Sequence, residues 1–194
     1  MHWGLLLPIC YRGENDPEDC WDNLSHFFES LGATTSLKER AELKIYVGID
    51  QYDLQFDKSE AREKISALAD AVQVPAVSFS LLRSHFRSKL CHIWSHLAHQ
   101  AVGDGSDLFV LLGDDIRFLS PGWKSEIERQ FEDIAAKRRL PLGFGCVCFR
   151  DISFKVFPTF PVIHRSHMDA FGSLFPQEFV NQHGDPYLFE LYRR

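Results

Sequence analysis

The sequence lacks the features that mark secreted, membrane-spanning and disulfide-stabilised proteins. It has five cysteines, an odd number without the close spacing of a small disulfide framework, so we expect a reducing compartment. No segment approaches the roughly 20 apolar residues that a membrane helix needs. The apolar run at residues 5–7 has no basic residues before it and no cleavage-site pattern after it. We therefore expect a soluble protein without a signal peptide or membrane association, located in the nucleus or the cytoplasm.

Positive charge is also in short supply. The 21 Lys and Arg residues against 27 Asp and Glu residues give a net charge of −6, which argues against a domain whose whole surface binds nucleic acid. By contrast, 45% of the 194 residues are hydrophobic, and 17 of them are Phe. Such a chain can bury a sizeable core, so disorder is excluded. The length predicts a single domain, residues 1–194.

Short apolar runs alternate with amphipathic stretches along the first two thirds of the chain. Strands are expected at 3–9, 43–49, 74–79 and 108–112, each followed by a helix. Asp16 and Ser84 are expected to begin the first and third of these helices, and Gly32 to end the first. Four strand–helix units predict an α/β fold, a three-layer sandwich with a mainly parallel central sheet.

The chain beyond Pro141 is less regular and rich in Phe and Pro. We expect this part to shape a pocket rather than to extend the sheet. The helical pattern at 188–194 is still in progress at the last residue, which suggests that the natural chain continues.

Candidate functional residues lie just after the expected strands, because ligands of open parallel sheets bind at the carboxyl ends of the strands. The loop after the first strand has one glycine, Gly13, and its acidic residues would repel a diphosphate. It is therefore not a glycine-rich phosphate-binding loop. Asp50 follows the second strand, either to bind a nucleobase or ribose or simply to form a turn.

The pair Asp114 and Asp115 follows the fourth strand. Carboxylates at a strand end can hold Mg²⁺ or Mn²⁺, and such an ion can bridge two phosphates. The alternative is that the two aspartates merely begin a solvated turn.

Residues 108–118, an apolar strand leading into Gly-Asp-Asp-Ile and a further short strand, resemble the metal-binding aspartate motif of GT-A-fold glycosyltransferases. The segments 157–162, 171–172, 179–186 and 191–194 are similar to the base-J-type (TET/JBP-associated) DNA glucosyltransferases. They are also similar to the related carboxyl-terminal domain of the estrogen-induced growth regulator of breast cancer. The resemblance covers nearly the whole chain. It implies a GT-A (Rossmann-like) fold in which residues 1–120 bind the nucleotide sugar and residues 121–194 form the acceptor side.

The resemblance also implies roles for individual residues. Asp115 is expected to bind the divalent ion. His183 is a third metal ligand, a residue that positions the base, or an ordinary loop residue. Asp185 is the expected catalytic base, and its alternative role is to cap the helix ahead of Pro186. The expected donor-binding residues are Pro8, Cys10, Tyr11, Arg12, Asp50, Lys89 and Asp114.

Together, these roles imply a metal-assisted, inverting reaction that transfers glucose or a close relative from a UDP-sugar to a hydroxyl group. The acceptor would be a hydroxymethylpyrimidine in DNA or a protein side chain. Gly113 stands where many family members have an acidic residue, which favours the alternative of a catalytically silent GT-A-like module within a larger protein.

Two further groups of metal-ligating residues have ordinary explanations. His92, His96 and His99 recur along one helix, but Ile93 replaces the glutamate that a zinc protease needs, so a zinc hydrolase is only a third hypothesis. Cys146 and Cys148 alternate on one expected strand and suit buried small hydrophobic residues.

Overall fold

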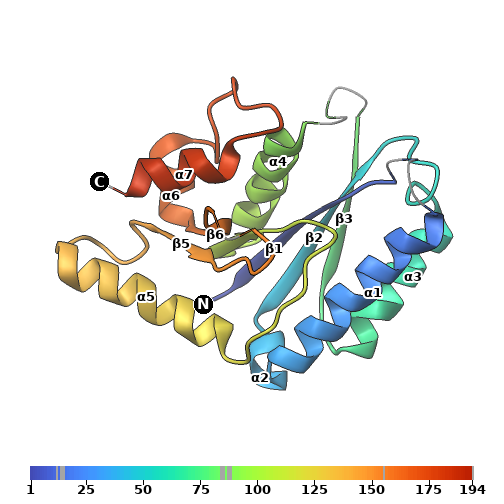
Figure 1. Ribbon diagram of the computed structural model, residues 1–194, viewed down its shortest axis with the longest axis horizontal. Helices are drawn as coiled ribbons and strands as arrows, with labels where there is room; N and C mark the ends of the chain where they lie inside the picture. The colour runs from blue at the N-terminus through green and yellow to red at the C-terminus, as the bar shows by residue number, and fades with distance from the viewer. Residues whose placement is uncertain (12, 14–15, 84–85, 87–88, 155, 194) are drawn as a thin grey trace.

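The computed structural model describes residues 1–11, 13, 16–83, 86, 89–154 and 156–193, and these residues build a six-stranded sheet flanked by helices (Figure 1). The strands are β1 (Trp3–Ile9), β2 (Leu43–Asp50), β3 (Val77–Leu82), β4 (Leu108–Leu111), β5 (Cys146–Phe149) and β6 (Thr159–His164). The helices are α1 (Pro17–Thr34), α2 (Leu37–Arg40), α3 (Ser59–Ala71), α4 (Leu90–Gly103), α5 (Trp123–Arg138), α6 (Arg165–Phe171) and α7 (Gly184–Tyr192).

The strand order is β3-β2-β1-β4-β6-β5. Strands β1 to β4 are mutually parallel, whereas β6 runs antiparallel to both β4 and β5. The predicted parallel sheet is thus confirmed for the first four strands. The expectation that the chain beyond Pro141 does not extend the sheet is wrong, because β6 and β5 add two strands beside β4. Pro161 is tolerated in β6 because it pairs with Cys148, where the β5–β6 register shifts.

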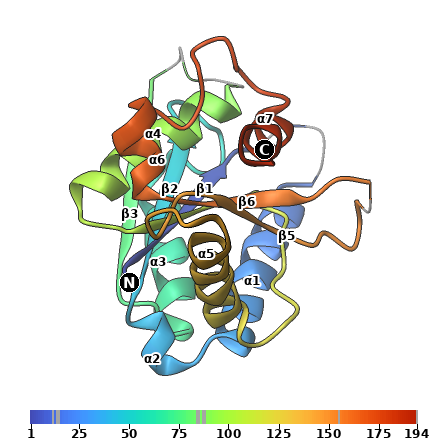
Figure 2. The ribbon, with the colours of Figure 1, turned by 90° about the vertical axis from the view of Figure 1, so that its left-hand side faces the viewer.

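Helices cover both faces of the sheet, as predicted (Figure 2). One core joins α1, α3 and α5 to the side chains of Trp3, Leu5 and Leu7 on β1. The other joins α4, α6 and α7 to Leu6 on β1 and Phe109 on β4. Alternate residues of a strand point to opposite faces, so the continuous apolar sequence of β1 reflects burial on both sides.

Helix α1 begins as predicted but ends later. Asp16 accepts a hydrogen bond from the Glu18 backbone N–H at 3.0 Å, and the helix then continues past Gly32 to Thr34. Gly32 serves a different purpose, because a Cβ there would lie 2.9 Å from Cγ1 of Val72. The glycine therefore allows α1 to pack closely against the end of α3.

Two other boundaries differ from the prediction. Strand β3 begins at Val77 rather than residue 74, because the Val74 N–H donates to the Ala69 carbonyl and closes α3. Helix α4 begins at Leu90, and the predicted cap Ser84 lies outside the described residues. Within the described parts of the chain, no helix is both long and apolar enough to cross a membrane.

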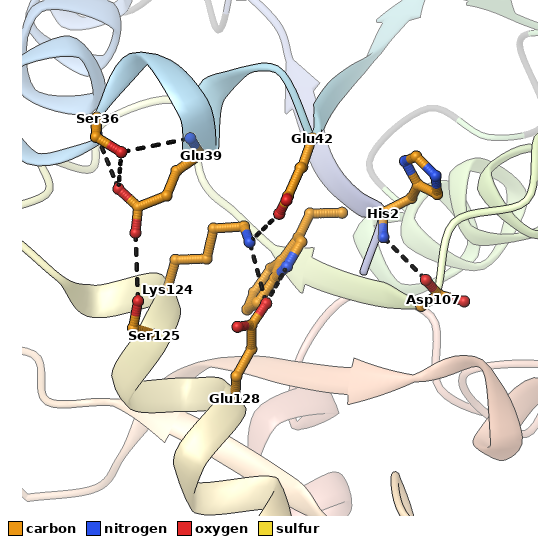
Figure 3. A network of polar contacts seen from close by, with 9 residues as sticks. His2, Ser36, Glu39, Glu42, Asp107, Lys124, Ser125 and Glu128 are labelled. Carbon is orange, nitrogen blue, oxygen red and sulfur yellow. Dashed lines mark hydrogen bonds and ion pairs between the residues drawn. The ribbon is translucent and has the colours of Figure 1, made fainter.

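The buried Lys124 connects α5 to the end of the sheet at which β2 begins (Figure 3). Nζ of Lys124, whose side chain is only 4% exposed, donates to Glu42 at 2.5 Å and to Glu128 at 3.0 Å. It also lies 5.1 Å from the centre of the Trp3 ring, and the Trp3 indole N–H donates to Glu128. These contacts join the start of α5 to β1 and to the residue that precedes β2.

Candidate functional site

The carboxyl ends of β1, β2 and β4 meet at one edge of the sheet. Ile9 pairs with Ile49, and the Leu112 N–H continues the β1–β4 ladder by donating to the Leu6 carbonyl at 3.0 Å. The structure therefore brings most of the predicted donor-side and metal-binding residues to this edge. They are Pro8, Cys10, Tyr11, Asp50, Asp114 and Asp115. Arg12 lies outside the described residues.

The loops after β1 and β2 are tied together by Asp53, which the sequence analysis did not single out. Its Oδ2 accepts from the Tyr11 backbone N–H at 2.7 Å. Its Oδ1 accepts from the backbone N–H groups of Gln55 and Phe56 at 2.9 and 2.8 Å. An aspartate whose side chain accepts from the backbone N–H two residues later forms a turn that the sequence can indicate. The contact of Asp53 with Tyr11, by contrast, depends on the pairing of β1 and β2.

A hydrogen bond anchors the backbone at Leu112, two residues before the aspartate pair. The Trp94 indole N–H, from α4, donates to the Leu112 carbonyl at 3.1 Å. At the next residue, Gly113, a Cβ would lie 2.9 Å from Oδ1 of Asp115. The glycine thus makes room for the Asp115 carboxylate to lie against the backbone, and any side chain at this position would displace that carboxylate.

A cavity of about 590 Å³ opens beside Asp115. The loop after β4 and the loop after β5 form its walls. Its aromatic lining residues are Phe118, Trp123, Phe149 and Phe160, and its charged lining residues are Asp115, Arg117, Arg150 and Asp151. This volume lies in the range of small-molecule binding sites.

Asp151 organises the cavity wall. Its Oδ1 accepts from the Ser153 backbone N–H, the Ser153 hydroxyl and the Phe154 backbone N–H, at 2.8, 2.6 and 3.1 Å. These hydrogen bonds, that of the Ser153 hydroxyl first, lower the pKa of Asp151. Its Oδ2 accepts from the Thr159 hydroxyl at 3.2 Å, so Asp151 holds the loop after β5 against β6.

Asp185 lies in the first turn of α7. Burial raises its pKa to about 6, and a hydrogen bond from the Phe160 backbone opposes that rise. Its Oδ1 is buried and has no hydrogen-bond partner among the residues that the structure describes. The predicted alternative, that Asp185 caps the helix, is wrong, because His183 occupies the N-cap position and no side chain caps this end.

Phe160 lies between Asp185 and the aspartate pair. Its backbone adopts a left-handed conformation with φ of 51°, an uncommon state for a non-glycine residue. Its ring lines the 590 Å³ cavity, and Cε1 lies 3.7 Å from where a Cβ of Gly113 would be. Asp185 itself does not line that cavity, so Phe160 separates the predicted catalytic base Asp185 from the predicted metal ligand Asp115.

The expectation that the chain beyond Pro141 shapes a pocket is confirmed by this wall, but the sequence analysis did not single out Phe160, Arg150 or the other residues in it. No local signal identifies them, because they reach the site only when β6 and β5 join the sheet. Of the remaining predicted residues, Lys89 is half-buried at the N-cap of α4 and His183 is exposed.

No group of three or more His, Cys, Asp or Glu side chains is placed to hold a metal ion within the described parts of the chain. The two carboxylates after β4 still suit an ion such as Mg²⁺, which usually takes one or two protein carboxylates together with substrate phosphates and water. The helix histidines have other contacts. His92 Nε2 lies 3.0 Å from the Gln177 carbonyl, and the ring of His96 packs 5.4 Å from that of Phe86.

No protein-family model matches the sequence, and a search of the curated proteins finds no match either. The fold and the site therefore define the chain at the level of its class. It is an α/β protein with an open, mostly parallel, Rossmann-like sheet, and its candidate site lies at the carboxyl edge of that sheet.

Proposed function

We propose that this chain is a GT-A-type glycosyltransferase that moves a sugar, glucose or a close relative, from a UDP-sugar to a hydroxyl acceptor. One observation carries the proposal. The pair Asp114 and Asp115 follows a fully buried parallel strand, at the edge where β1 and β2 also end, and Asp115 opens into a cavity of about 590 Å³. The resemblance of the aspartate motif and of the carboxyl-terminal segments to glycosyltransferases supplies the reaction type.

In this proposal the donor lies across the ends of β1, β2 and β4. Tyr11 and Asp50 bind the nucleobase and the ribose, and Lys89 faces the diphosphate. Asp115, supported by Asp114, holds Mn²⁺ or Mg²⁺ together with the donor phosphates. When bound, the ion neutralises the charge that develops on the leaving diphosphate.

The acceptor in this proposal enters the aromatic cavity beside Asp115. A flat ring can stack on Phe118, Trp123 or Phe160, as a pyrimidine or a sugar would. Asp185 accepts the proton of the attacking hydroxyl, and a carboxyl with a pKa of about 6 is a better base near neutral pH than an ordinary aspartate. A hydroxymethylpyrimidine in DNA and a protein hydroxyl are the two acceptor classes.

The burial of Asp185 favours a second candidate function, a catalytically silent module that binds a nucleotide. Oδ1 of Asp185 is buried, and the residue does not line the cavity in which an acceptor would lie. Hydrolysis of the donor separates the two candidates, because a transferase releases some sugar to water and a silent module releases none.

Replacing Asp115 tests the donor and metal site directly. We expect Asp115→Ala to weaken Mn²⁺-dependent binding of UDP by about tenfold or more, since one of two protein ligands is lost. Calorimetric titration of UDP with and without Mn²⁺ measures this. The matched control is Asp70→Ala, which removes an exposed carboxylate near the end of α3. Unchanged affinity of Asp115→Ala for UDP in Mn²⁺ would rule out the metal role of this residue.

Gly113→Ala tests the same site without removing a charge. The added methyl group would lie 2.9 Å from Oδ1 of Asp115, which can move because it is the end of a side chain. We therefore expect stability to change by less than about 0.5 kcal/mol, while Mn²⁺-dependent affinity for UDP falls. Chemical denaturation and the same titration measure the two effects, and full affinity in this variant would contradict the placement of Asp115.

A further inference from the structure

A pair of thiols lies on β5, outside the proposed donor site. Cys146 and Cys148 are both free cysteines, and their Sγ atoms are 3.7 Å apart. Residues two apart on a strand point to the same face, so both thiols face the helices α6 and α7 rather than α5. Cys146 packs against the core that these helices share with α4.

The two thiols differ in access and in acidity. Cys148 lines an open pocket of about 250 Å³, together with Phe149 and Phe157, whereas Cys146 does not line it. The hydrogen bond between the two sulfurs lowers the pKa of Cys148 and, with burial, raises the pKa of Cys146. Because the thiolate is the nucleophile, Cys148 is the cysteine that reacts first with an incoming reagent.

The strand that carries the pair can bend. Closing the sulfur separation from 3.7 Å to the roughly 2.05 Å of a disulfide requires a local change of the backbone. β5 is an edge strand of four residues that pairs only with β6 among the described strands, and its register with β6 shifts between Cys148 and Phe149. A bend at this point therefore disturbs few ladder hydrogen bonds.

We propose that Cys146 and Cys148 form a reversible oxidation site, in which a peroxide converts the two thiols into a disulfide within β5. The Cys148 thiolate attacks one oxygen of hydrogen peroxide, the O–O bond breaks, hydroxide leaves, and Cys148 becomes a sulfenic acid. The Cys146 sulfur then attacks the Cys148 sulfur, and the hydroxyl group leaves with the Cys146 proton as water. The peroxide is reduced by two electrons and the thiol pair is oxidised by two. A disulfide strained by its position on a strand is readily reduced again by dithiols.

Mass spectrometry tests this site on the intact chain. Trypsin cleaves after Arg139 and Arg150, so a single peptide, residues 140–150, contains both thiols. After brief exposure of the folded protein to hydrogen peroxide and alkylation under denaturing conditions, we expect this peptide to lose two hydrogens and to escape alkylation. Dithiothreitol should restore alkylation of both cysteines.

Single substitutions assign the order of events. Cys146→Ser should stop the reaction at a Cys148 sulfenic acid, which dimedone traps, and Cys148→Ser should leave Cys146 reduced. Circular dichroism checks that each variant is folded. Cys91, which is buried and whose pKa burial raises to about 11, serves as the internal comparison. Oxidation of Cys91 at the same rate, or accumulation of sulfenic acid in the unsubstituted protein, would overturn the proposal.

Discussion

At the scale of single residues, Asp185 has a proposed catalytic role, and its buried charge lowers the stability of the folded protein at neutral pH. Its pKa is raised from 3.8 to about 6 by burial, so the folded protein holds the proton more tightly than the unfolded chain does. The stability associated with this group is therefore fully present below about pH 4 and is lost as the pH rises through 6. Buried groups with raised pKa values are common at functional sites.

Asp185→Asn is expected to stabilise the protein at neutral pH. The amide keeps an oxygen that can accept the Phe160 N–H, and it carries no charge to bury. We expect a gain of about 2 kcal/mol in the free energy of unfolding at pH 7.5 and almost none at pH 4. Urea denaturation at the two pH values measures the difference. An equal effect at both pH values would mean that Asp185 is not the titrating group.

At the scale of elements, the start of α5 depends on Lys124. Nζ of Lys124 pairs with Glu42, which precedes β2, and with Glu128 on α5 (Figure 3), and it lies over the ring of Trp3 on β1. The hydrogen bond from Lys124 lowers the pKa of Glu42. This stabilising contribution is present above the ordinary glutamate pKa of 4.5 and is lost as the pH falls through the lower folded value.

Lys124→Met retains most of the buried chain length but removes the charge. We expect a loss of about 2 kcal/mol in the free energy of unfolding at pH 7, since two carboxylates lose their partner but stay partly hydrated. The loss should shrink as the pH falls below 4.5, because Glu42 then takes up a proton, first in the variant and at lower pH in the unsubstituted protein. Lys137→Met, at the exposed end of the same helix, is the control and should change stability little. Equal losses in the two variants would contradict a special role for Lys124.

Local signals predicted some elements well and others poorly. The range of β1 and the start of α1 at the Asp16 cap were predicted correctly, because an apolar run between polar segments and an Asp-Pro helix start are local features. The end of α1 was not predicted correctly, because Gly32 packs against Val72, which lies forty residues further along the chain. The start of β3 was also missed, since its first three predicted residues include the closing turn of α3.

At the scale of the whole molecule, the sequence predicted the parallel half of the sheet but not its antiparallel extension. Repeated strand–helix units determine the arrangement of β1 to β4, and that arrangement is enough to gather Tyr11, Asp50 and Asp115 at one edge. Strand β6 pairs with β4 although the two are about fifty residues apart in the sequence, and the Phe- and Pro-rich sequence of β6 does not read as a strand. The cavity beside Asp115 depends on that pairing, so the sequence indicated that the chain beyond Pro141 shapes a pocket but not which of its residues line it.

The pairing of β4 with β6 also limits how the protein can be divided. Every residue of β4, Leu108–Leu111, is at most 1% exposed. A fragment ending near residue 120 would present this apolar strand as an open edge, with unpaired N–H and C=O groups available to strands of other molecules. Such a fragment would self-associate, so the segment that contains β6 acts as a shield against aggregation.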